Sequence, residues 1–245
     1  MLRMLWRMVQ TGLYAGFLTA IIYSAVQAVT VTPLILEAEI YEQAGGAHGH
    51  GAPVAIAEPE AELWRPSAGF ERYGFTFFAN IVTAVGFAFV LVAAFAVRGR
   101  QVDMRAGLWW GLAGYAIFTL APSLGLPPEA PGAAAADLQA RQIWWFATMA
   151  ATALALGLLV FAKPLGLRAI GIPILLLPHL IGAPQPIGLD PGPVPPELAS
   201  LYVVWALVAA LFFWLLLGAS AGEIYRRLGD GEQGSAGRLG HHDPG

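Results

Sequence analysis

Long apolar runs alternate with short charged segments along the whole chain. Six runs of at least 20 residues contain no Asp, Glu, Lys or Arg. A helix rises 1.5 Å per residue, so about 20 residues cross the roughly 30 Å hydrocarbon core of a bilayer. The pattern predicts an all-α integral membrane protein with about six transmembrane helices, at about 9–34, 75–97, 106–126, 142–162, 169–189 and 198–222.

The composition fits this membrane class. Of the 245 residues, 57% are hydrophobic and 12% are charged, whereas soluble domains carry about 25% charged residues. There is no Cys, which excludes disulfides and thiolate metal sites.

The distribution of Lys and Arg orients the predicted helices. When loops are assigned alternately from the inside, ten of the 13 Lys and Arg residues fall on the inner side and three (Arg65, Arg72 and Arg141) on the outer side. This bias fits the positive-inside rule. We therefore expect cytoplasmic N- and C-termini and three outward-pointing hairpins.

The two ends of the chain allow separate predictions. A signal peptide cleaved after Ala28 is an alternative for the first span, but the apolar run continues to Leu36, which favours a retained helix. We expect residues 1–228 to form one polytopic membrane domain. Residues 229–245, with His241 and His242, are predicted to be a disordered cytoplasmic tail.

Three pairs of glycines are spaced four residues apart. Small residues at this spacing let membrane helices approach closely, although glycine is common in such helices and the spacing also arises by chance. The helix-packing candidates are Gly12, Gly16, Gly107, Gly111, Gly218 and Gly222.

The longest polar segment is the predicted outer loop 37–72, which is rich in Glu. It contains the sequence AHGHG with His48 and His50. Imidazoles and carboxylates suit divalent transition metals, so Glu37 and Glu42 could complete a shell around an ion held by the two histidines. A solvated acidic loop that binds nothing is the alternative.

His179 lies in a predicted span and is flanked by Pro178, Pro184 and Pro186. Ionisable groups at membrane depth usually face a cavity or a partner. Prolines remove backbone donors and free carbonyls that can line an ion path. We interpret residues 169–189 as a broken span. Its prolines interrupt the helical backbone, and His179 faces the interruption. A packing role against a neighbouring helix remains open.

Other polar residues in the spans are sparse. Asn80 lies on the second span, and Thr148 and Thr152 lie four residues apart on the fourth. Bridging between helices is the commoner role of such groups. No span carries the clustered His, Asp and Glu that a catalytic metal requires, so we do not expect an enzyme.

Five sequence segments resemble those of the CbtA family in their order and in their residues. They are YEQAGGAHGHG at 41–51, FFANIVTAVGFAFVL at 77–91, GLWWGLAGYAIFTLAPSLGLPPEAPG at 107–132, RQIWWFATMAATALAL at 141–156 and LPHLIGAPQP at 177–186. The resemblance implies a predicted cobalt transporter subunit of the bacterial inner membrane, associated with vitamin B12 metabolism. It also implies a small, single-span, His-rich partner of the CbtB type.

The resemblance carries functional roles onto particular residues. The His-rich first loop matches His48 and His50, the Pro-Pro-Glu block matches Glu129, and the PHLIGAPQP block matches His179. The first loop of family members often has more His than this one. The resemblance therefore implies that histidines of a partner contribute to metal capture.

Two functions follow as hypotheses. In the first, outer ligands gather Co2+, or a similar divalent ion, as transported cargo, and Glu129, Glu197 and His179 hand it through the membrane. No permanently bound cofactor and no nucleic-acid partner are expected; the surroundings are the lipid bilayer. The alternative is a non-transporting accessory or assembly protein.

Overall fold

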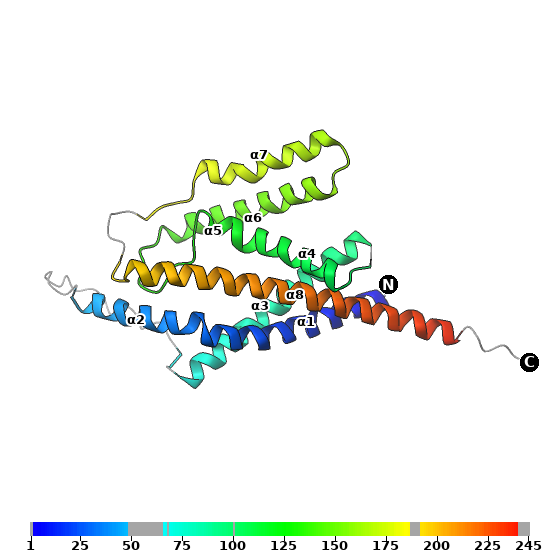
Figure 1. Ribbon diagram of the computed structural model, residues 1–245, viewed down its shortest axis with the longest axis horizontal. Coiled ribbons are helices and arrows are strands. Elements are labelled where there is room, and N and C mark those ends of the chain that lie inside the picture. Colours follow the sequence, from blue (N-terminus) through cyan, green and yellow to red (C-terminus); the bar gives the residue numbers. More distant parts are fainter. Residues whose placement is uncertain (1, 49–65, 68, 100, 187–191, 240–245) are drawn as a thin grey trace, which may run out of the picture. The chain divides into compact units, whose positions relative to one another are not determined.

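The computed structural model describes residues 2–48, 66–67, 69–99, 101–186 and 192–239. Across these ranges all regular structure is helical, and no strand is present. The elements are α1 Leu2–Val29, α2 Val31–His48, α3 Phe70–Arg98, α4 Met104–Tyr115, the π-helical turn η1 Ala116–Leu120, α5 Ala121–Ser123, α6 Leu138–Phe161, α7 Leu165–Ile181 and α8 Pro196–Leu239 (Figure 1).

Four helices in the described ranges are long and apolar enough to cross a membrane. They are α1, α3, α6 and the Pro196–Asp230 part of α8. In the part that the structure describes, the chain is all-helical and has membrane-spanning character. The predicted spans 106–126 and 169–189 fall instead on the interrupted series α4–η1–α5 and on the 17-residue helix α7.

The helices divide into two compact units. Unit 1 contains residues 1–25, 70–114 and 211–245, and unit 2 contains residues 26–69 and 115–210. The divisions fall inside α1, just before α3, before the last residue of α4, and inside α8.

Glycines bring the helices of unit 1 close together. A Cβ added at Gly107 would overlap the carbonyl oxygen of Gly218, and one at Gly222 would overlap that of Asp103. On α1, a Cβ at Gly16 would collide with Val85 of α3. All six glycines proposed from the sequence lie at such approaches, because Gly12 faces Phe89 and Gly111 faces Trp214.

Aromatic and polar contacts complete unit 1. Phe95 of α3 is fully buried, and its ring packs edge-on against Tyr225 of α8. The Arg7 guanidinium lies 3.6 Å above the centroid of the same Tyr225 ring, and its Nε donates to the Tyr225 carbonyl at 2.9 Å. Between α3 and α1, Asn80 Nδ2 donates to Ser24 Oγ at 2.9 Å, which is the bridging role expected for Asn80.

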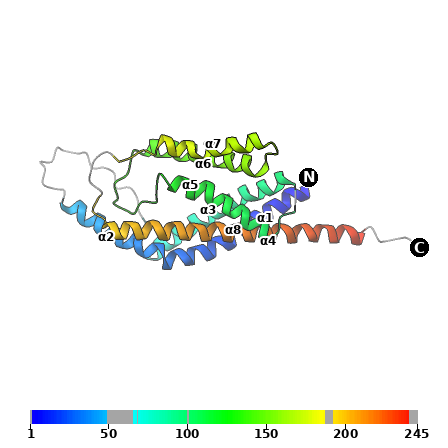
Figure 2. The ribbon, with the colours of Figure 1, turned by 45° about the horizontal axis from the view of Figure 1, so that its top comes forward.

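In unit 2, α6 and α7 form an antiparallel hairpin (Figures 1 and 2). A Cβ at Gly171 would contact the Ala155 carbonyl, so the two helices approach closely there. Near the hairpin turn, Arg168 Nε donates to the Leu159 carbonyl at 3.0 Å. A separate apolar cluster joins α2, the segment after α5 and the start of α8 through Leu34, Ala38, Ala130, Val194 and Leu198.

Two sequence predictions were wrong in their local geometry. Residues 37–48 were assigned to a loop, but they form the second half of α2. Thr30 separates α2 from α1, because Pro33 lacks the N–H that would continue the helical hydrogen bonds.

The prolines of α7 do not break the helix where the sequence suggested. Pro173 and Pro178 both lie inside it. The helix ends at Ile181 because Gly182 adopts a φ of +89°, which a residue with a Cβ rarely adopts.

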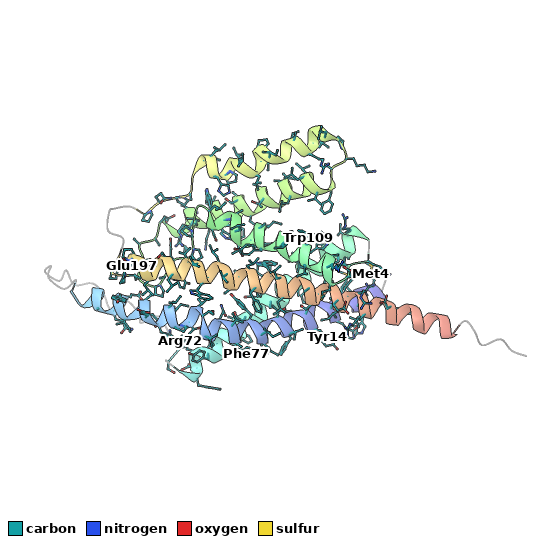
Figure 3. All side chains as sticks on the ribbon, in the orientation of Figure 1. Met4, Tyr14, Arg72, Phe77, Trp109 and Glu197 are labelled. Atoms are coloured by element: carbon teal, nitrogen blue, oxygen red, sulfur yellow. The ribbon has the colours of Figure 1, made fainter. Side chains whose placement is uncertain are left out.

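Large apolar side chains cover the outer surface of the helices. Figure 3 shows Tyr14, Phe77 and Trp109 among them; Tyr14 is 57% exposed and Trp109 is 73% exposed. These exposed apolar faces suit a lipid environment, as do the four long apolar helices.

Candidate functional site

An open pocket of about 510 Å³ lies in unit 2, between the Pro-Pro-Glu segment and the first turns of α6. Its polar lining comes from Ser123, Glu129, Arg141 and Gln142, and Trp145 is part of its apolar lining. The pocket therefore combines one carboxylate and one guanidinium with an aromatic surface.

The start of α6 fixes the cationic side of this pocket. Asp137 caps the helix, because its Oδ1 accepts from the Ala140 N–H at 2.9 Å. Arg141 follows one turn later, and its Nη2 lies 2.6 Å from Glu129 Oε2. About a quarter of each side chain is exposed. The Arg141 Nε is buried and has no hydrogen-bond partner in the described structure.

This ion pair changes the interpretation of Glu129 as a ligand. The sequence suggested Glu129 as a ligand for the ion, whereas the structure gives its carboxylate a charged partner. A cation that binds Glu129 must therefore compete with the Arg141 guanidinium.

His179 lies in the last turn of α7, next to the beginning of α6. The Trp144 and His179 rings meet edge to face, with centroids 5.9 Å apart. Trp144 Nε1 donates to the Pro178 carbonyl at 3.3 Å. His179 is half-buried and makes a packing contact in this arrangement, while its imidazole nitrogens stay chemically able to bind a metal.

The predicted outer ligands are dispersed. Glu37 and Glu42 are exposed on α2, and Glu42 lies against Gly132. His48 is the last residue of α2, and His50 lies outside the described residues. Glu197 is exposed in the first turn of α8 (Figure 3).

Among the described residues, no three His, Cys, Asp or Glu side chains come together to hold a metal ion. The described metal-ligand candidates nevertheless all belong to unit 2. The six packing glycines all belong to unit 1.

The comparison with protein families supplies the deciding observation. Residues 5–226 match the family described as probable cobalt transporter subunit (CbtA). The chain belongs to the CbtA family. The match to CbtA includes the pocket, the Glu129–Arg141 pair and His179. No curated protein and no solved structure matches the chain.

Sequence reasoning missed the two partners that define the site's geometry. Arg141 was counted only as an outer cation, and the contacts of Trp144 were not predicted. The sequence did offer a signal for the ion pair. Arg141 lies at the start of a predicted span, and Glu129 lies close to it in the preceding loop.

Proposed function

We propose that this CbtA protein is the membrane subunit of a system that takes up Co2+ for vitamin B12 metabolism in the bacterial inner membrane. Membership of a family of probable cobalt transporter subunits, over residues 5–226, carries this proposal. The word subunit implies a partner, and we propose a small single-span protein of the CbtB type with a His-rich end. Cobalt is cargo in this scheme, and the chain acts without catalysis or a resident cofactor.

The membrane arrangement in this proposal has six spans, three outward-pointing hairpins and cytoplasmic termini. Four helices support it directly by length and composition. The series α4–η1–α5 and the apolar helix α7 would supply the other two crossings. The bias of Lys and Arg toward the proposed inner side supports the orientation.

The proposed route begins with outer ligands. His48, His50, Glu37 and Glu42 would gather the ion, with histidines of the partner. Glu129 and Glu197 would accept it next, followed by His179. Dispersed ligands suit transport, since an ion that is bound too tightly does not leave.

Uptake of radioactive Co2+ tests the proposal. Cells would express the chain with and without the His-rich partner, alongside a Glu129→Gln variant of equal membrane abundance. We expect uptake above empty cells only with the intact chain and partner, and a strong reduction in the variant. Equal uptake by empty and expressing cells would overturn the transport function.

An accessory or assembly role is the second candidate. The absence of a three-ligand cluster from the described residues favours it. Uptake by the partner alone, with the CbtA chain changing only the partner's abundance, would identify that role.

A further inference from the structure

Thr148 and Thr152 are buried polar residues in the middle of α6. Thr148 is 0% exposed and Thr152 is 2% exposed. Neither hydroxyl has a hydrogen-bond partner within the described structure. They therefore do not make the helix bridge that the sequence suggested for them.

Two other threonines of the chain, Thr11 and Thr30, behave differently. Thr11 Oγ1 donates to the Arg7 carbonyl at 2.8 Å, and Thr30 Oγ1 donates to the Val26 carbonyl at 2.7 Å. Both bonds run to the carbonyl four residues earlier in the same helix, which is the usual solution for a helical hydroxyl. Thr148 and Thr152 do not use it. Since buried polar groups are normally satisfied by protein or water, these two hydroxyls require another oxygen.

The two threonines continue a stripe that begins at the pocket. Arg141, Trp144, Thr148 and Thr152 are spaced three or four residues apart and share one face of α6. Arg141 lines the pocket, and its Nε is also buried without a partner. From Arg141 to Thr152 the stripe extends about 16 Å at 1.5 Å per residue.

The elements packed on α6 carry backbone oxygens that lack their helical donors. The Ala121 N–H pairs with the Ala116 carbonyl in the π-helical turn, and Pro122 has no N–H. The Ile117 carbonyl would accept from residue 121 in an α-helix or from residue 122 in a π-helix. It therefore lacks both helical donors. On α7, Pro178 leaves the Ile174 carbonyl without its helical donor. Both η1 and α7 pack against α6.

We propose that this face of α6, which is closed to water in this structure, lines a cation path that runs inward from the Glu129–Arg141 pocket past Trp144 to Thr148 and Thr152. The path rests on the proposed transport function. Hydroxyl and carbonyl oxygens are neutral ligands that can replace part of the water shell of a divalent cation. They bind it weakly enough for it to move on.

Cysteine accessibility tests the path without any transport measurement. The chain has no Cys, so Thr148→Cys and Thr152→Cys each introduce a single thiol into the full chain in its membrane. The probe is a cationic, water-soluble thiosulfonate reagent. Matched controls are Ala88→Cys, at a fully buried position of α3, and Thr83→Cys, at an exposed position of the same helix.

We expect the reagent to modify Thr148→Cys and Thr152→Cys at least tenfold faster than Ala88→Cys and Thr83→Cys. Millimolar Co2+ should slow the reaction at the two path positions alone. Modification no faster than in the two controls would overturn the path.

A second pair of variants guards against misfolding of the cysteine forms. Thr148→Val with Thr152→Val keeps the side-chain shape and removes both hydroxyls, whereas Thr148→Ser with Thr152→Ser keeps them. We expect Co2+ uptake to fall several-fold in the Val form and to survive in the Ser form at equal abundance. Equal uptake by both forms would contradict the path while leaving the proposed function intact. Absent uptake by the native chain, with fast modification of both thiols, would instead contradict the cobalt function alone.

Discussion

Glu129 and Arg141 form an ion pair with 2.6 Å between Oε2 and Nη2, at the pocket of unit 2. The pair joins the segment after α5 to the first turn of α6. Arg141 neutralises Glu129, the one carboxylate that lines this pocket. The free energy of cation binding there therefore depends on the cost of separating Glu129 from Arg141.

Replacing Arg141 by Gln should therefore strengthen cation binding. A partly exposed ion pair contributes up to about 1 kcal/mol, which corresponds to about a fivefold change in affinity. We expect Arg141→Gln to lower the Co2+ concentration at half-maximal uptake by up to about fivefold. Glu129→Asp is the control, because it keeps the charge. An unchanged or higher half-maximal concentration in Arg141→Gln would mean that Arg141 does not compete with the ion.

His179→Phe separates the two roles that the structure leaves to this residue. Phe retains an aromatic edge against Trp144 but has no ring nitrogen. On the proposed route, Co2+ uptake should fall at least tenfold while the thermal unfolding temperature in detergent stays within a few degrees. Full uptake with unchanged stability would make His179 a packing residue only.

The glycine contact between α4 and α8 predicts a large loss of stability on a small change. In Gly218→Ala, the added methyl group would collide with the Gly107 carbonyl and the Gly111 backbone. Overpacking of this kind costs about 1–3 kcal/mol, so both thermal stability in detergent and membrane abundance should fall.

Gly86→Ala is the matched control for that substitution. Gly86 lies inside α3, and a Cβ there would meet no atom within 4 Å. Since Ala favours helix over Gly by about 1 kcal/mol, this variant should be as stable as the native chain or more so. Equal losses in Gly86→Ala and Gly218→Ala would rule out a specific contact at Gly218.

The hydrogen bond between Asn80 and Ser24 predicts coupling between α3 and α1. A double-mutant cycle with Asn80→Ala and Ser24→Ala should give a coupling energy of about 0.6 kcal/mol, the average for such bonds in membrane proteins. Unfolding in mixed detergent would supply the four free energies. Strictly additive effects would show that the bond contributes nothing to stability.

Features that depend on the length of an apolar run or on the size of a residue could be predicted from the sequence. Uncharged runs of at least 20 residues located the long helices α1, α3, α6 and α8, because crossing a bilayer imposes a length. The glycine pairs marked close helix approaches, but spacing within one helix cannot reveal the partner. Only the fold matches Gly107 and Gly111 with Gly218 and Gly222.

Features that depend on tertiary context were not predictable in the same way. Residues 37–48 are polar and were assigned to a loop, yet α2 continues through them while Leu34 and Ala38 pack into an apolar cluster. The π-helical turn at 116–120 carries no sequence periodicity. The pairing of Glu129 with Arg141 required the chain to reverse direction between α5 and α6.

The length of α7 has a consequence for the membrane itself. Its 17 residues span about 25 Å at 1.5 Å per residue, about 5 Å less than the average hydrocarbon thickness. In the proposed six-span arrangement, thinning of the bilayer around α7 would match this length, at a fraction of a kcal/mol per Å. The bilayer would thus be thinnest beside the helix that carries His179, where a thin barrier lowers the electrostatic work of moving a divalent charge. Activity should accordingly respond to acyl-chain length, and short-chain lipids should favour it.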